Sequence, residues 1–169
     1  MKILKKILFA LLIIFVAIQF IRPQKNKSSE ITASHIYNMY PASPEVKSIL
    51  NKACNDCHTN NTNYPWYAQI QPAAWWLNDH IKDGKRKLNF SEFGAYRIAK
   101  QYKKLDECNE EVKEGDMPIE PYTYIHRNAK LTQDEKIKLA EWTIAIRDSI
   151  QAKYPADSLV QPKRKVESK

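Results

Sequence analysis

The chain has 169 residues, which is enough for one domain of ordinary size with extensions at its ends. Only 3 residues are glycine, too few for the many tight turns of a β-sandwich or a βαβ fold, and 43 % are apolar, enough for a packed core. The net charge of +8 is compatible with an acidic redox partner. It does not predict a nucleic-acid ligand, because much of the excess lies near the two ends, at Lys2, Lys5, Lys6, Lys163, Arg164, Lys165 and Lys169.

Residues 1–22 have the features of an uncleaved signal anchor. The basic stretch "MKILKK" precedes the apolar run Ile7–Ile18, which is short for a bilayer crossing but is extended by apolar residues and by the stem of Arg22. No small-x-small cleavage site and no lipid-accepting cysteine follows. A buried core helix is the alternative, but such a helix would carry a polar face. We therefore expect a membrane anchor, with the rest of the chain on the periplasmic, extracytoplasmic side of the cytoplasmic membrane.

The rest of the chain divides into three parts by composition. Residues 23–38 predict a polar, flexible stalk, residues 39–153 a folded domain, and residues 154–169 a disordered basic tail. Within the domain, apolar residues recur at intervals of three and four, and we find neither internal repeats nor convincing strands. The sequence therefore predicts a small all-α domain.

The first two helices of this domain are marked by capping signals. Ser43 is a good N-cap and Pro44 suits the first helical position, so a helix is expected to begin there and to run into Cys54. A second helix is expected to open at Pro72 and to close at Gly84.

The last two helices are marked in the same way. A third helix is expected to begin near Ser91 and to stop at Gly115. A fourth should open at Thr132, which forms a capping-box pattern with Glu135, and should end before Pro155.

The stretch "CNDCH" carries the strongest chemical pattern in the chain. Cys54, Cys57 and His58 match C-x-x-C-H, the attachment signature of c-type haem. Two thiols three residues apart lie on one face of a helical turn and can form thioether bonds to the two vinyl groups of one porphyrin edge. The adjacent imidazole then becomes an axial ligand of the iron. The pattern predicts one covalently attached haem c.

Three other kinds of site use the same residues. A zinc site needs a second pair of ligands at suitable spacing, but Cys108 is alone and His80 and His126 are far apart in sequence. A thioredoxin-type redox pair needs a βαβ context, which the helical pattern does not provide. A disulfide between Cys54 and Cys57 would close a loop too short to give much stability.

A methionine is the expected second axial ligand. Met117 lies in "GDMP", where Gly115 ends a helix and Pro118 stiffens the chain, so the side chain can be held toward a fixed atom. A thioether paired with an imidazole raises the reduction potential of haem iron. Met39 is the other candidate methionine, and a surface or core role is the alternative for Met117.

The remaining histidines compete with Met117 as ligands. His80 shares a helix with two tryptophans, and His126 lies in the loop after Met117, where it could contact a haem propionate. We favour an ordinary core or surface role for both and assign no role to His35.

The chain resembles a known group at these residues. "CNDCHTN", then "GDMP" and a capped C-terminal helix are similar to the small class I cytochromes c. More narrowly, "CHTNNTNYPWYAQIQPAAWWLNDHI", "LNFSEF" and "GDMP" resemble the haem-binding-domain family of bacterial envelope proteins over roughly residues 39–150, and "QFIRP" after the anchor resembles it too. The resemblance implies a cytochrome c-like fold around one haem, with Cys54 and Cys57 as thioether positions, His58 as proximal ligand and Met117 as distal ligand.

Aromatic residues and one extra cysteine complete the candidate site. Trp66, Trp75 and Trp76 are expected either to line the haem pocket and exclude water or to form ordinary core. Cys108 falls in the apolar phase of its helix, which predicts a buried, inert thiol.

Three functions are compatible with these features. The first is a membrane-tethered electron carrier that exchanges electrons with redox proteins of the cell envelope. The second is a haem-based sensor or peroxidase-like enzyme in which Met117 is displaceable. The third is a binding module in which the haem is structural. Because no acid–base pair, Ser-His arrangement or phosphate loop occurs, the carrier is favoured over an enzyme.

Overall fold

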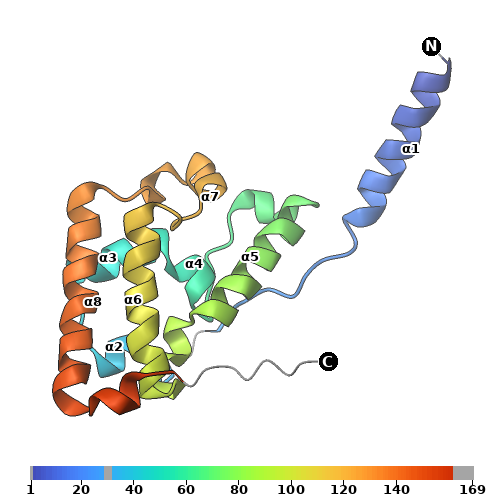
Figure 1. Cartoon of the computed structure of the whole chain (residues 1–169). Coiled ribbons are helices and arrows are strands. Elements are labelled where there is room, and N and C mark those ends of the chain that lie inside the picture. The colour runs from blue at the N-terminus through green and yellow to red at the C-terminus, as the bar shows by residue number, and fades with distance from the viewer. Residues whose placement is uncertain (1, 29–31, 162–169) are drawn as a thin grey trace, which may run out of the picture.

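The computed structural model describes residues 2–28 and 32–161, and this part of the chain contains helices and no strands. The prediction of an all-α fold is therefore confirmed for the described residues. The main helices in chain order are α1 (Lys2–Ile18), α2 (Ile36–Met39), α3 (Pro44–Ala53), α4 (Asn55–His58), α5 (Ala73–Lys87), α6 (Ile98–Glu114), α7 (Glu120–Ile125) and α8 (Gln133–Lys153). Four short 3₁₀ helices lie between and after them: η1 (Trp66–Gln69), η2 (Phe90–Ala95), η3 (Arg127–Ala129) and η4 (Ala156–Leu159). Figure 1 shows α1 rising away from the bundle that the other helices form.

The larger hydrophobic core lies where α8 packs against α6 and α3 (Figure 1), and it also includes residues of α2 and η2. Each helix contributes residues spaced three or four apart, which places them on one face. Burying a side chain of this size contributes roughly 1.5–3 kcal/mol to folding. The fully or nearly fully buried members include Leu50, Phe93, Leu105, Leu139 and Ile150.

A smaller hydrophobic cluster joins α5 to α4 and η1. Tyr67, Leu77 and Ile81 are buried in it, and Cys57 packs against them. The prediction that Gly84 ends the second helix is wrong, since α5 continues to Lys87 and Gly84 is buried inside it. A Cβ atom at Gly84 would lie 2.7 Å from the carbonyl oxygen of Cys57, so the absence of a side chain lets α5 approach the turn that carries this cysteine.

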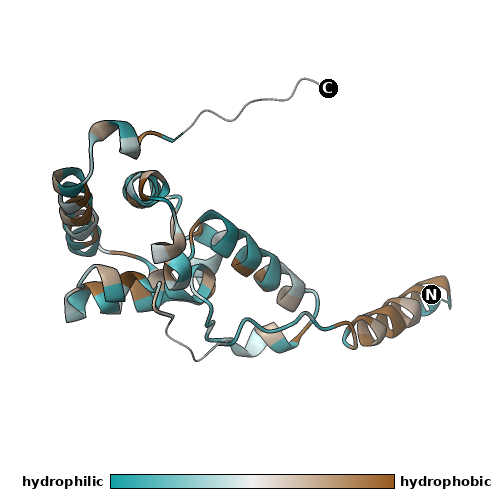
Figure 2. Cartoon of the chain, turned by 90° about the horizontal axis from the view of Figure 1, so that it is seen from below, coloured by the Kyte–Doolittle hydropathy of each residue, from teal (hydrophilic) through white to brown (hydrophobic). Residues whose placement is uncertain are grey.

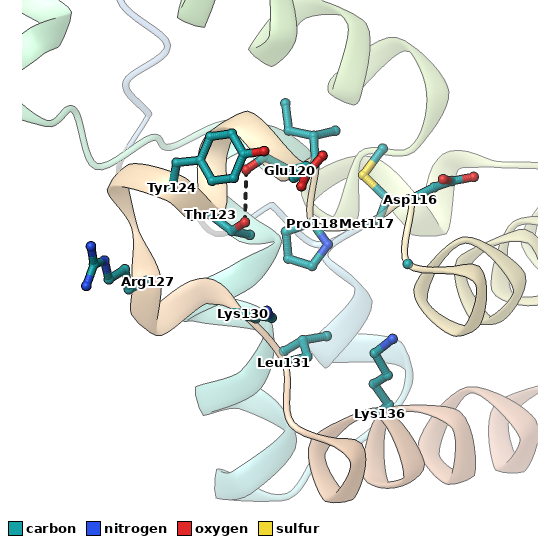
Figure 3. A pocket seen from close by; sticks show the side chains of 12 residues that line it. Asp116, Met117, Pro118, Glu120, Thr123, Tyr124, Arg127, Lys130, Leu131 and Lys136 are labelled. Carbon is teal, nitrogen blue, oxygen red and sulfur yellow. Dashed lines mark hydrogen bonds between the residues drawn. The ribbon is translucent and has the colours of Figure 1, made fainter.

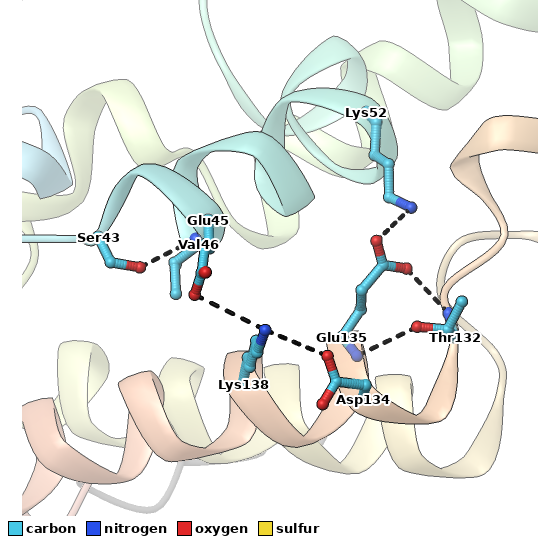
Figure 4. Close-up of polar contacts among 8 residues, drawn as sticks. All are labelled: Ser43, Glu45, Val46, Lys52, Thr132, Asp134, Glu135 and Lys138. Carbon is cyan, nitrogen blue, oxygen red and sulfur yellow. Dashed lines mark hydrogen bonds and ion pairs between the residues drawn. The ribbon is translucent and has the colours of Figure 1, made fainter.

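The helix ends predicted from local signals are mostly confirmed. The Ser43 side chain accepts a hydrogen bond from the N–H of Val46, and Gly115 ends α6 in a left-handed conformation with φ of 91°. Thr132 and Glu135 form the predicted capping box. Figure 4 shows that the Glu135 carboxylate also pairs with Lys52 of α3, at 2.6 Å, so the capped end of α8 is tied to α3.

Two segments that we expected to be unstructured are instead packed on the domain. In the predicted stalk, Ile36 is fully buried and Asn26 is hydrogen-bonded to Tyr64 and Thr59. In the predicted tail, η4 packs on α6 and Leu159 contacts the larger core. Residues 162–169 lie outside the described part of the chain. The third predicted helix also differs, because η2 occupies its first residues and α6 begins only at Ile98.

The helix α1 has apolar side chains on every face and buries none of them. Figure 2 shows it as the most continuously hydrophobic element of the chain. Among the described residues, no helix combines the length and the apolar character needed to cross a membrane.

Candidate functional site

The predicted attachment motif forms a tight turn at the end of α3. Cys54 ends α3 and directly precedes α4, and its carbonyl oxygen accepts hydrogen bonds from the N–H groups of Cys57 (3.1 Å) and His58 (3.0 Å). These two bonds wind both thiols and the imidazole around a single helical turn. All three cysteines of the chain are free thiols in the structure.

The His58 ring is held in one orientation by the backbone of the next segment. Its Nδ1 lies 2.9 Å from the carbonyl oxygen of Leu88, and because a carbonyl can only accept, Nδ1 carries the proton. Burial lowers the pKa of His58, which favours the neutral ring. The unprotonated Nε2 is therefore the ring nitrogen that can bind a metal, which is the arrangement that metal-ligating histidines usually have.

Two cavities, of about 90 Å³ and about 260 Å³, share His58 and Met117 among their lining residues. Cys54 lines the smaller cavity and Cys57 the larger one. The structure therefore brings together four of the residues predicted from sequence, although Met117 is far along the chain from the other three.

The loop that carries Met117 is fixed at its base. The N–H groups of Gly115, Asp116 and Met117 all donate to the carbonyl oxygen of Glu111, at 3.1, 2.9 and 3.1 Å. The left-handed conformation of Gly115 makes this reversal of the chain possible. The methionine is partly buried and packs against the larger core.

A third cavity, of about 860 Å³, is larger but is less closely related to the motif (Figure 3). It shares Met117, Pro118 and Ile119 with the 260 Å³ cavity, and its other walls come from the turn after α6, from α7 and from the chain between α7 and the start of α8. Neither the two thiols of the motif nor His58 lines it. We therefore assign the candidate site to the two smaller cavities.

The three tryptophans predicted to line the haem pocket do not line either of these cavities. Trp66 is 75 % exposed, Trp76 packs against the ring of His80, and the Trp75 indole donates to the carbonyl of Ile21. The tryptophans lie on η1 and α5, whose inward positions are taken by other residues. The aromatic walls of the cavities are instead Phe90 and Tyr122.

Two of these lining residues were not predicted from sequence. Phe90 approaches His58 with ring centroids 6.0 Å apart, and Tyr122 donates a hydrogen bond to Asp56 inside the motif, at 2.9 Å. The position of Tyr122 five residues after Met117 was the only sequence signal that could have indicated it.

The other candidate ligands have different partners. His126 is hydrogen-bonded to the hydroxyl of Tyr67 at 2.9 Å. His80 lines the 260 Å³ cavity, and its Nδ1 lies 2.8 Å from the carbonyl oxygen of Trp76. Met39 is 41 % exposed and lines neither cavity. Cys108 is partly buried in the wall of the smaller cavity beside Cys54, and burial raises the pKa of its thiol to about 11.

The donor set fits haem iron better than a bare metal ion. An imidazole with a free Nε2 and a thioether share two apolar-walled cavities, and two thiols stand on the same turn as the imidazole. No group of three or more His, Cys, Asp and Glu side chains suited to a metal ion occurs in residues 2–28 and 32–161. The zinc alternative, which requires such a group, gains no support.

A comparison with protein families agrees with this chemistry. The family model described as a haem-binding domain matches residues 13–145, most of the chain. The chain belongs to the haem-binding-domain family. No curated protein and no solved structure matches it. The matched region of this haem-binding domain includes the motif, the Met117 loop and the last third of α1.

Proposed function

We propose that this protein is a membrane-tethered c-type cytochrome that carries electrons in the cell envelope. Membership of the haem-binding-domain family supports the haem. The observation that carries the finer proposal is the placing of His58 and Met117 on the same two cavities, with Cys54 and Cys57 on the turn beside them. That arrangement offers two covalent links and two axial ligands for one haem c.

Each of these residues would have a separate task. Cys54 and Cys57 would bond the porphyrin edge, and the Leu88 carbonyl would keep His58 in the tautomer that binds iron through Nε2. Met117, held by the anchored loop, would be the second ligand of the iron. The bound haem supplies one-electron chemistry, by cycling between ferrous and ferric iron.

Iron held by both His58 and Met117 would favour an electron carrier over a sensor or a peroxidase-like enzyme. Gas sensing and peroxide chemistry need an open or easily opened coordination site. The loop of Met117 has three of its backbone N–H groups bonded to one carbonyl, which restrains the movement that opening would need.

The proposal places the domain on the periplasmic side of the cytoplasmic membrane. The apolar stretch of α1 that follows its three lysines would serve as the tether, with the positive end on the cytoplasmic side. Its partners would then be redox proteins of the envelope.

Covalent attachment is tested by expressing the full chain together with a haem c maturation system. We expect a band that keeps its haem stain on a denaturing gel and loses it in Cys54→Ala/Cys57→Ala. The matched control is Cys108→Ala, which should keep the stain because this thiol lies outside the motif. A wild-type protein that releases its haem on denaturation would contradict the proposal.

Axial ligation is tested by adding CO to the reduced protein. The carrier should show a low-spin spectrum that CO leaves unchanged, whereas Met117→Ala should bind CO readily and lose the sulfur-to-iron charge-transfer band of the ferric form. Ready binding of CO by the wild-type protein would favour the sensor or enzyme instead.

A further inference from the structure

The exit of α1 is fastened to the first turn of α5 by hydrogen bonds. The N–H of Gln71 donates to Oε1 of Gln19 at 2.9 Å, and Nε2 of Gln19 donates back to the carbonyl of Gln71 at 3.3 Å. Nε1 of Trp75 and Nε2 of Gln71 both donate to the carbonyl of Ile21, at 2.9 and 3.0 Å. Gln71 is only 2 % exposed, so its bonds to Gln19 and Ile21 are partly shielded from water, whereas the bond from Trp75 is exposed.

A second set of bonds follows a few residues later. The N–H of Asn26 donates to the hydroxyl of Tyr64 at 2.6 Å. The side-chain Oδ1 of Asn26 accepts a hydrogen bond from Nζ of Lys85, also at 2.6 Å. The segment between α1 and the domain is thus bonded at two points. The direction in which α1 leaves the domain is therefore set by the fold and not by a free linker.

Exposed apolar side chains gather on the elements next to this exit. They occur on the second and third residues after α1, on η1 and its C-cap, on α5 and on α7. Figure 1 shows α7 and the start of α5 on the side of the bundle from which α1 rises. We call these residues the aromatic edge: Phe20, Ile21, Trp66, Ile70, Trp76, Tyr124 and Ile125.

We propose that the aromatic edge lies in the head-group region of the membrane that holds α1. This inference rests on the proposed tether. The 17 residues of α1 rise about 25 Å, less than the roughly 30 Å of a hydrocarbon core, so the surface beside α1 is drawn toward the lipid. Tryptophan and tyrosine favour this boundary because their rings are apolar and their N–H and O–H groups remain hydrated.

The large exposed apolar area of the aromatic edge favours contact with lipid over contact with water. Trp66 is 75 % exposed and Phe20 is 82 % exposed, and contact with lipid would remove this apolar area from water. Because α7 follows the Met117 loop, the same contact would hold the candidate haem site at a fixed distance from the bilayer.

The inference is tested with spin labels on the full-length, haem-loaded protein in phospholipid vesicles. Trp66→Cys and Ile125→Cys place single labels on two elements of the edge, in a Cys108→Ala background so that no other free thiol remains. Ile144→Cys on α8 is the control, since this residue is similarly exposed but lies outside the edge. Collision of each label with oxygen, which concentrates in lipid, is compared with collision with a water-soluble nickel complex.

We expect the oxygen-to-nickel ratio at residues 66 and 125 to rise several-fold on transfer from detergent-free buffer to vesicles, and the ratio at residue 144 to stay unchanged. An unchanged haem spectrum shows that each labelled variant is folded. If the protein sediments with the vesicles and resists carbonate extraction while residues 66 and 125 remain in water, the aromatic edge is wrong and the tether stands. If the protein fails to associate with the vesicles, the tether and the aromatic edge are both overturned.

Discussion

The hydroxyl of Tyr122 donates a hydrogen bond of 2.9 Å to the carboxylate of Asp56. Asp56 lies inside the attachment motif, and Tyr122 lies on α7 shortly after Met117. The ring of Tyr122 also stacks on His126, with centroids 4.2 Å apart and an interplanar angle of 17°. The hydrogen bond therefore joins the attachment motif to the helix that follows the Met117 loop. These are the two segments that would hold the haem.

Replacing Tyr122 with Phe removes this hydrogen bond and keeps the ring. A hydrogen bond to a charged group contributes about 1.5–3 kcal/mol, and we expect a loss near the lower end because Asp56 is only partly buried. With its link to the motif gone, the Met117 loop should move more easily, so the reduced variant should bind CO more tightly than the wild type. Denaturant unfolding and a CO titration measure the two effects.

Tyr124→Phe is the matched control for this substitution, because Tyr124 lies on the same helix and is 65 % exposed. It should leave both measurements close to wild type. Equal CO affinity in Tyr122→Phe and Tyr124→Phe would show that the Tyr122–Asp56 bond does not restrain the loop.

Gly84→Ala should disturb the approach of α5 to the motif. The new Cβ would lie 2.7 Å from the Cys57 carbonyl oxygen and 3.2 Å from the Cys57 Cβ, so one of the two segments must shift. Overpacking of this kind typically costs about 1–3 kcal/mol, which outweighs the better helix propensity of alanine. We expect a lower unfolding free energy and less attached haem per polypeptide. Lys82→Ala, on the exposed side of the same helix, should be nearly neutral.

Glu135 should make the stability depend on pH in the acid range. The hydrogen bond from Lys52 and the backbone N–H of Thr132 lower the pKa of this carboxyl in the folded protein. A lowered folded pKa gives stability that is present above the unfolded value of about 4.3 and is lost as the pH falls through the folded value. Between about pH 5 and pH 3, the wild type should therefore lose more unfolding free energy than Glu135→Gln.

The measurement for Glu135 is chemical unfolding at a series of pH values. Glu141→Gln, at an exposed position of α8, serves as the control and should follow the wild-type curve. Parallel curves for the wild type and Glu135→Gln would mean that the contact with Lys52 and Thr132 does not survive in solution (Figure 4).

Cys108 should resist alkylation in the folded protein. Burial, with a smaller contribution from Glu111, raises the pKa of the thiol from 9.0 to about 11, which reduces the reactive thiolate about a hundredfold near neutral pH. Iodoacetamide at pH 7.5–8 should modify it only after denaturation, as followed by mass spectrometry. An exposed thiol placed at residue 144 should react at once, and rapid labelling of Cys108 itself would show that the wall of the smaller cavity is open.

Several helix ends were predictable because their signals are local. Ser43 and Thr132 cap their helices through bonds that span three residues, and Gly115 ends α6 through its own backbone conformation. Gly84 was misread for the converse reason. Its lack of a side chain serves a contact with Cys57, which lies on another helix, and nothing near Gly84 in the sequence reveals that contact.

One short stretch of the sequence predicts the chemical type of the candidate site. The spacing of Cys54, Cys57 and His58 is a property of one helical turn, and it indicates covalent haem in any fold that lets the turn form. The surroundings of that turn could be learned only from the packed helices. They are the Leu88 carbonyl on His58, the Tyr122 hydroxyl on Asp56, and the position of the tryptophans outside the cavities. The reason is that helical spacing sets contacts within a few residues, whereas contacts between distant segments depend on how whole helices pack.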